Sequence, residues 1–115
     1  MVIYVVEVGV LLTKEDEEYD SYCVYDKQFG YYDEGLTGYL KYEDAKKTAL
    51  EYCKNGVIGT YAIILKDDDF PDVENQEELY ETVIEFDNTR EVIYNVYNYF
   101  KGNNGNMLYE NFMKL

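Results

Sequence analysis

The sequence predicts an α+β fold in which a mainly antiparallel sheet of four to six strands carries one helix on one face. Three patterns support this fold class: apolar residues alternate near the N-terminus, recur at helical spacing in the middle, and flank an Asn-Gly pair near the C-terminus. The chain has 115 residues, the usual size of one domain. We therefore expect a single domain covering residues 1–115.

The first expected element is a strand over residues 2–12 with one buried face. Its even positions are Val2, Tyr4, Val6, Val8, Val10 and Leu12. The odd positions include Glu7 and Gly9, so the period of two fits a strand. The acidic residues 14–20 follow as a turn or loop. Residues 19–35 mix tyrosines with aspartates and glycines, which suits a short exposed strand or hairpin.

The second expected element is a helix over residues 42–55, YEDAKKTALEYCKN. One stripe of this helix carries Ala45, Ala49, Tyr52 and Cys53, with Leu50 at its margin. Glu43 and Asp44 fall in the first turn and Lys54 in the last, as the helix dipole prefers. The Asn55-Gly56 pair predicts a left-handed stop at the C-terminal end.

The remaining expected elements are strands. Residues 57–65 are apolar except at Gly59 and Thr60, which predicts a strand in the middle of the sheet with the helix on one face. The strand pattern resumes at residues 82–86 and 91–99, with residues 87–90 as a turn. Asn104-Gly105 predicts a hairpin turn that pairs this last strand with a final one over residues 107–113.

The charge balance is the most unusual feature of the chain. Twenty-four acidic residues stand against ten basic ones, with no histidine, and the formal net charge is -14. Such a field repels nucleic acids and anionic membranes and attracts basic protein surfaces. Residues 15–34 and 67–91 hold nineteen of the acids, whereas the predicted helix is nearly neutral. We therefore expect one anionic face that binds a basic nucleic-acid-binding protein.

The residues expected to contact this partner come from both acidic segments. They are Glu15, Asp16, Glu17, Glu18, Asp20, Asp33, Glu34, Asp67, Asp68, Asp69, Asp72, Glu74, Glu77, Glu78 and Tyr80. Tyrosines interleaved with the acids can stack on arginine side chains. A different interpretation is that the charge only keeps the protein soluble.

The sequence gives no reason to expect an enzyme, a cofactor or a metal site. It contains no P-loop, GxSxG, GxGxxG or HExxH motif. Asp67 and Asp69 fit the first ligand positions of a calcium loop, but Pro71 and Asp72 break the EF-hand pattern. A looser divalent site is the alternative to a solvated acidic loop. Cys23 and Cys53 lack metal-ligand spacing. They could form a disulfide only if the fold brings them together, and two buried thiols are the expectation.

Three segments carry a resemblance to known proteins: YEDAKKTALEYCKNGVIGTYAIIL, VIYNVY and YENFM. With its small size, its acidity and its many Tyr, Asn, Lys and Glu residues, the chain resembles small proteins of phages and mobile elements in low-GC bacteria. Within that group it is similar in charge to acidic anti-CRISPR and anti-restriction proteins. The resemblance implies an inhibitor that blocks the PAM-reading or DNA channel of a nuclease, such as a Cas nuclease.

Two other functions stay open at this level. The first is a non-enzymatic domain that self-associates, as a homodimer for example, or binds other proteins through its tyrosine-rich sheet. The second is a small-ligand binder, which would need Lys46, Lys47, Lys54 and Arg90 to converge on an anionic ligand. The N-terminal segment is apolar but too short to span a membrane and lacks the basic flank of an export signal. We therefore expect the cytoplasm of a host cell as the location.

Overall fold

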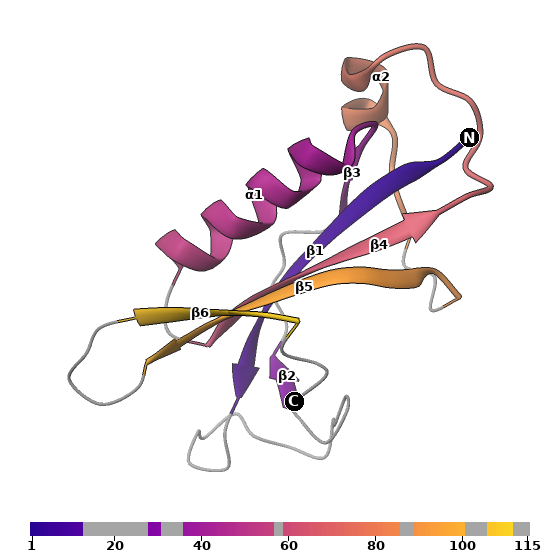
Figure 1. Ribbon diagram of the computed structural model, residues 1–115. Helices are drawn as coiled ribbons and strands as arrows, with labels where there is room; N and C mark the ends of the chain where they lie inside the picture. Colours follow the sequence, from indigo (N-terminus) through magenta and orange to yellow (C-terminus); the bar gives the residue numbers. More distant parts are fainter. Residues whose placement is uncertain (13–27, 31–35, 57–58, 86–88, 101–105, 112–115) are drawn as a thin grey trace.

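The structure is a computed structural model that describes residues 1–12, 28–30, 36–56, 59–85, 89–100 and 106–111. They form one six-stranded sheet with two helices packed against it (Figure 1). In chain order the elements are β1 (Ile3–Leu12), β2 (Gln28–Gly30), β3 (Leu36–Tyr39), α1 (Tyr42–Asn55), β4 (Thr60–Asp67), α2 (Gln76–Glu81), β5 (Glu91–Phe100) and β6 (Asn106–Glu110).

All strand pairs are antiparallel, in the order β2-β1-β4-β5-β6. Strand β3 pairs with the same edge of β1 as β2 does, further toward the start of β1, so the sheet is five strands across. The predicted α+β class with an antiparallel sheet is therefore confirmed. The central position of β4 is confirmed too, although this strand begins at Thr60 and residues 57–58 lie outside the described part.

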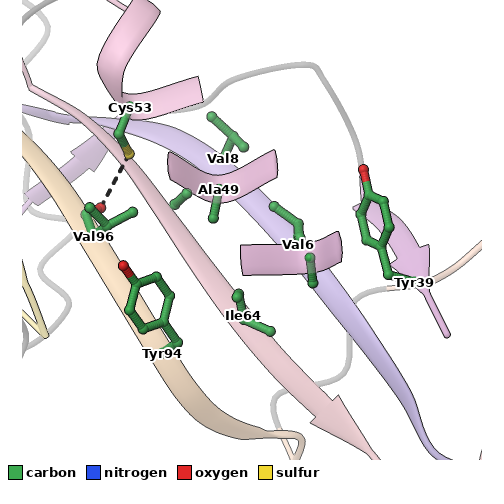
Figure 2. Packing of buried hydrophobic residues seen from close by; sticks show 10 residues of the cluster. Val6, Val8, Tyr39, Ala49, Cys53, Ile64, Tyr94 and Val96 are labelled. Atoms are coloured by element: carbon green, nitrogen blue, oxygen red, sulfur yellow. Dashed lines mark hydrogen bonds between the residues drawn. The ribbon is translucent and has the colours of Figure 1, made fainter. Parts of the chain in front are cut away.

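Helix α1 covers one face of the sheet and has the predicted bounds. Ala45, Ala49 and Cys53 are fully buried on its inner stripe, and their small side chains let the helix lie close to β1, β4 and β5 (Figure 2). The Cys53 thiol donates a hydrogen bond to the carbonyl oxygen of Val96, 3.4 Å away. Burial raises the pKa of Cys53 to about 12, so this thiol is inert at neutral pH.

The C-terminal end of α1 differs from its prediction. Gly56 has φ -81°, so the left-handed stop expected at Asn55-Gly56 is wrong. The buried side chain of Asn98 on β5 takes over part of this role: its amide nitrogen donates to the carbonyl oxygens of Cys53 (2.5 Å) and Gly56 (3.2 Å). The last carbonyls of a helix have no partner within the helix, so Asn98 supplies a donor where α1 ends. A side chain 45 residues away in the sequence therefore caps the helix.

The opposite face of the sheet is also covered, which contradicts the expectation that β1 has one buried face. Ile3 and Val5 are fully buried at odd positions, where they pack in one cluster with Leu79 of α2 and with Ile84. Helix α2 was not predicted, and the strand expected at residues 82–86 is wrong. Residues 82–85 form no strand, and residue 86 lies outside the described part.

Glu7 lies on this second face, between Leu36 and Ile63 on the neighbouring strands. Its side chain is half-buried, and burial raises the pKa of its carboxyl group. It is the single charged residue of β1.

The C-terminal hairpin pairs as predicted, with Tyr97 opposite Tyr109. Strand β6 ends at Glu110, earlier than the expected residue 113, and Asn111 has a positive φ of 56°. The Asn104-Gly105 turn lies outside the described residues, as do Cys23 and most of residues 19–35. Strand β2 falls within that segment, whereas β3 was not predicted.

Candidate interaction surface

The acidic segment of residues 67–85 leaves the sheet at the end of β4 and crosses the face opposite α1 (Figure 1). Four apolar side chains hold it to the sheet: Phe70, Val73, Leu79 and Ile84. Because these side chains point inward, most of the carboxylates point to solvent. The exposed ones are Asp68, Asp69, Asp72, Glu74, Glu77, Glu78, Glu81 and Glu85. We call these eight residues, together with Tyr80, the acidic face.

Asp67 belongs to the support of this face. Its Oδ2 lies 3.0 Å from Nε of Arg90, and the two side chains are only 16% and 10% exposed. Its other carboxylate oxygen accepts a hydrogen bond from the backbone N–H of Asp69. Arg90 also donates to the carbonyl oxygen of Glu85, so it ties both ends of the acidic segment together. Asp67 therefore fixes the segment instead of presenting a free charge.

Two further acids have internal cations nearby. Asp68 lies 3.6 Å from the Lys66 ammonium group, and Asp72 lies 3.5 Å from the α-ammonium group of Met1. Both pairs are solvent-exposed, and the Asp72 side chain is 93% exposed. Exposed ion pairs contribute little free energy, so both carboxylates can exchange these partners for others.

Helix α2 begins with a variant of the capping box, in which the Glu78 carboxylate reaches the N–H one residue before the N-cap residue Asn75. The Asn75 side chain accepts a hydrogen bond from the N–H of Glu78 (2.8 Å), and the Glu78 carboxylate accepts one from the N–H of Glu74 (2.7 Å). At the other end, the Thr82 hydroxyl donates to the carbonyl oxygen of Glu78. A six-residue helix needs such contacts because it is too short to be stable alone.

Tyr80 is the exposed aromatic residue of α2. Its side chain is 55% exposed, and its ring meets the ring of Tyr39 edge to face at 5.9 Å. Partial burial raises the pKa of Tyr80, and the charges of Tyr39 and Asp44 add to this effect.

The predicted contact residues thus divide into three groups. Asp67 and Glu78 support the segment, although the Glu78 side chain is also exposed, and the others between Asp68 and Tyr80 are displayed at the surface. The third group lies outside the described residues: Glu15, Asp16, Glu17, Glu18, Asp20, Asp33 and Glu34. The expectation that both acidic segments form one face stays a prediction.

Gln76 and Gly38 hold α2 on β3, and neither residue was predicted to have a role. The N–H of Leu40 donates to Oε1 of Gln76, and Nε2 of Gln76 donates to the carbonyl oxygen of Gly38, both at 2.8 Å. The helix itself had a readable signal, because Asn75 followed by Glu78 matches the capping-box spacing. No comparable sequence pattern indicates the hydrogen bonds that join Gln76 to Gly38 and Leu40.

Other kinds of site have less support. Within the described residues, no three His, Cys, Asp or Glu side chains are placed to hold a metal ion. A hollow of about 400 Å³ lies at the C-terminal end of α1, lined by Glu51, Tyr52, Asn55 and Gly56. Two of the four cations that an anionic ligand would need are engaged separately: Lys46 lies 5.1 Å from the ring centroid of Tyr94, and Arg90 pairs with Asp67.

Comparisons with protein families, curated proteins and solved structures found no match. Neither α1 nor α2, the two helices of the described residues, is long and apolar enough to cross a membrane. The acidic face is therefore the feature from which a function can be inferred.

Proposed function

We propose that the acidic face binds a basic surface that normally holds nucleic acid, and that the protein acts as an inhibitor of the anti-CRISPR or anti-restriction type. Its target would be a nucleic-acid-handling protein such as an RNA-guided nuclease, met in the cytoplasm of a host cell. Nucleic-acid channels are lined with Lys and Arg, which neutralise closely spaced phosphates. A surface with densely spaced carboxylates can occupy such a channel and displace the same counterions.

The observation that carries this proposal is the fixed display of the carboxylates. The acidic segment is held by its apolar side chains, the Asp67–Arg90 pair and the capping box of α2. A solubilising loop needs none of these contacts. A fixed array, in contrast, loses little conformational entropy when it binds, so it gains affinity from preorganisation.

The residues best suited to contact the partner are the exposed ones with no supporting role of their own. Glu77 and Glu81 flank Tyr80 on the outer side of α2, and Glu74 precedes the helix. The Tyr80 ring adds a flat surface on which an arginine side chain can stack. Asp69 adds a further exposed carboxylate on the connection from β4.

The test is inhibition of DNA binding by an RNA-guided nuclease loaded with its guide RNA. We expect the wild-type protein to compete with target DNA, and its affinity to fall at least about tenfold between about 50 and about 500 mM salt, where the Debye length falls from about 14 Å to about 4 Å. Affinity that does not change with salt would refute the electrostatic mechanism.

A charge-matched pair of variants locates the interaction. Glu74→Gln with Glu77→Gln removes two charges from the acidic face, and Glu51→Gln with Glu110→Gln removes two exposed charges elsewhere. We expect the first pair to weaken binding about tenfold and the second by less than about twofold, because Glu51 lies on α1 over the other face of the sheet and Glu110 lies on the edge strand β6. Salt screens such charges away from the contact. Equal effects would mean that net charge alone acts.

Self-association is the second candidate, and one observation favours it. Strand β6 is the last strand of the sheet, and within the described residues its outer edge has no strand partner. Such an edge can pair with the same edge of a second copy. Light scattering that shows a stable dimer, together with no inhibition of the nuclease, would support this function over the first.

A further inference from the structure

The carboxamide of Gln76 occupies the outer edge of β3. One edge of this strand pairs with β1, where Tyr39 lies opposite Tyr4. On the other edge, Gln76 accepts a hydrogen bond from the N–H of Leu40 and donates one to the carbonyl oxygen of Gly38, each 2.8 Å long. The two backbone groups flank Tyr39 on either side in the sequence.

This pair of hydrogen bonds imitates a neighbouring strand. In a parallel ladder, a residue donates to the carbonyl of the residue that precedes its partner and accepts from the N–H of the residue that follows its partner. Gln76 bonds in the same way to Gly38 and Leu40, the residues on either side of Tyr39. A strand edge left unpaired invites pairing with another chain. One side-chain amide therefore closes this part of the edge and anchors α2 to it.

The anchoring matters because Gln76 is the first residue of α2. The helix has six residues, and Leu79 is its single fully buried one. Leu79 fixes which side of the helix faces the sheet, whereas the directional bonds of Gln76 fix the position of its first turn against β3. Together they determine where Glu77, Tyr80 and Glu81 are displayed.

We propose that Gln76 is the positioning residue of the acidic face: its amide bonds to β3 hold α2 in the orientation that binds a basic partner. The effect on binding rests on the function proposed above. The effect on α2 itself does not, because it concerns contacts within the chain.

The sharpest test is Gln76→Glu. The substituted carboxylate keeps the size of the side chain and can still accept from Leu40, but it places an oxygen against the carbonyl oxygen of Gly38. It also adds one negative charge to the acidic face. If charge alone governs binding, the variant should inhibit the RNA-guided nuclease at least as well as the wild type; if Gln76 positions the face, inhibition should weaken about tenfold.

A partner-free measurement accompanies this test. We expect amide hydrogen exchange at Leu79 and Thr82, whose N–H groups bond within α2, to become about tenfold faster in Gln76→Glu. Acid itself slows amide exchange, so the rates are compared with those of the wild type at the same pH. This ratio should return toward one as the pH is lowered, because a protonated carboxyl group can donate to Gly38 again. In Gln76→Met, which has no polar amide, exchange should stay about tenfold faster than in the wild type at every pH.

The outcomes separate the two proposals. Unchanged exchange in Gln76→Met, or stronger inhibition by Gln76→Glu, overturns the positioning role. Faster exchange with pH-dependent recovery supports it, even if the wild-type protein fails to inhibit the nuclease, and that failure would refute the proposed function alone. Glu77→Gln is the control with the opposite charge change, and it should leave exchange at Leu79 and Thr82 within about twofold of the wild type.

Discussion

Gly38 is the position where a single methyl group should disturb the acidic face without changing its charge. A Cβ added at Gly38 would lie 2.6 Å from Cδ1 of Ile84 and 3.1 Å from two carbon atoms of Leu79. Ordinary contact begins at 3.4 Å, so Ile84 must retreat by about 0.8 Å. Both side chains belong to the segment that carries the carboxylates, and both are buried. Gly38→Ala should therefore push this segment away from β3.

The expected cost follows from two opposing effects. Overpacking of a buried site costs about 1–3 kcal/mol, whereas replacing glycine by alanine stabilises by about 0.4–1 kcal/mol because the unfolded chain loses freedom. The free energy of unfolding should thus fall by about 1–2 kcal/mol. Urea unfolding followed by circular dichroism measures this change as a lower midpoint with an unchanged slope.

Ile84→Val provides the matched control because it removes Cδ1, the atom that the new methyl group meets first. Alone it should cost about 0.5–1.5 kcal/mol. Combined with Gly38→Ala it should cost much less than the sum, with a coupling energy of about 1 kcal/mol. A wild-type midpoint for Gly38→Ala, or simple additivity in the double variant, would refute the close contact between β3 and the acidic segment.

Three other substitutions test separate parts of the fold. Asn98→Ala should lower the free energy of unfolding by about 2–3 kcal/mol in urea titration, because the carbonyl of Cys53 loses its buried donor; a loss below about 0.5 kcal/mol would contradict the capping role. Glu7→Gln should stabilise the protein near pH 7 and have no effect below the ordinary pKa of 4.5. The folded wild type holds the Glu7 proton to higher pH than the unfolded chain does, so its stability falls as pH rises above 4.5; thermal unfolding from about pH 3 to pH 8 would show a constant difference if this is wrong. Arg90→Met should cost about 2–3 kcal/mol in urea titration because Asp67 is left unpaired, somewhat less than for a fully buried pair; an unchanged midpoint would mean that the pair gives no support.

The elements that the sequence predicted well are those with a local signal. Helix α1 has its apolar stripe and charged ends within its own residues, so its bounds could be read directly. The β5–β6 pairing followed from two apolar segments around a turn sequence. The stop of α1 could not be read in the same way, because its capping group is Asn98, a residue distant in sequence.

The second face of the sheet was missed for a related reason. Alternation in β1 indicated one apolar side, but Ile3 and Val5 are apolar on the other side as well, and only the position of α2 shows that they are buried. The exposed acidic stretch was foreseen from composition. The division of its carboxylates was not, because it depends on tertiary contacts such as the one between Asp67 and Arg90.

Competition between this protein and DNA tests the central claim most directly. The assay measures the affinity of an RNA-guided nuclease, loaded with its guide RNA, for target DNA while the wild-type protein or the Glu74→Gln/Glu77→Gln variant is titrated in at low and high salt. We expect the wild type to displace DNA at low salt, to lose at least about tenfold in affinity at high salt, and to exceed the variant about tenfold at low salt. Displacement that is equal for both proteins and independent of salt would contradict the claim that the acidic face binds in place of nucleic acid.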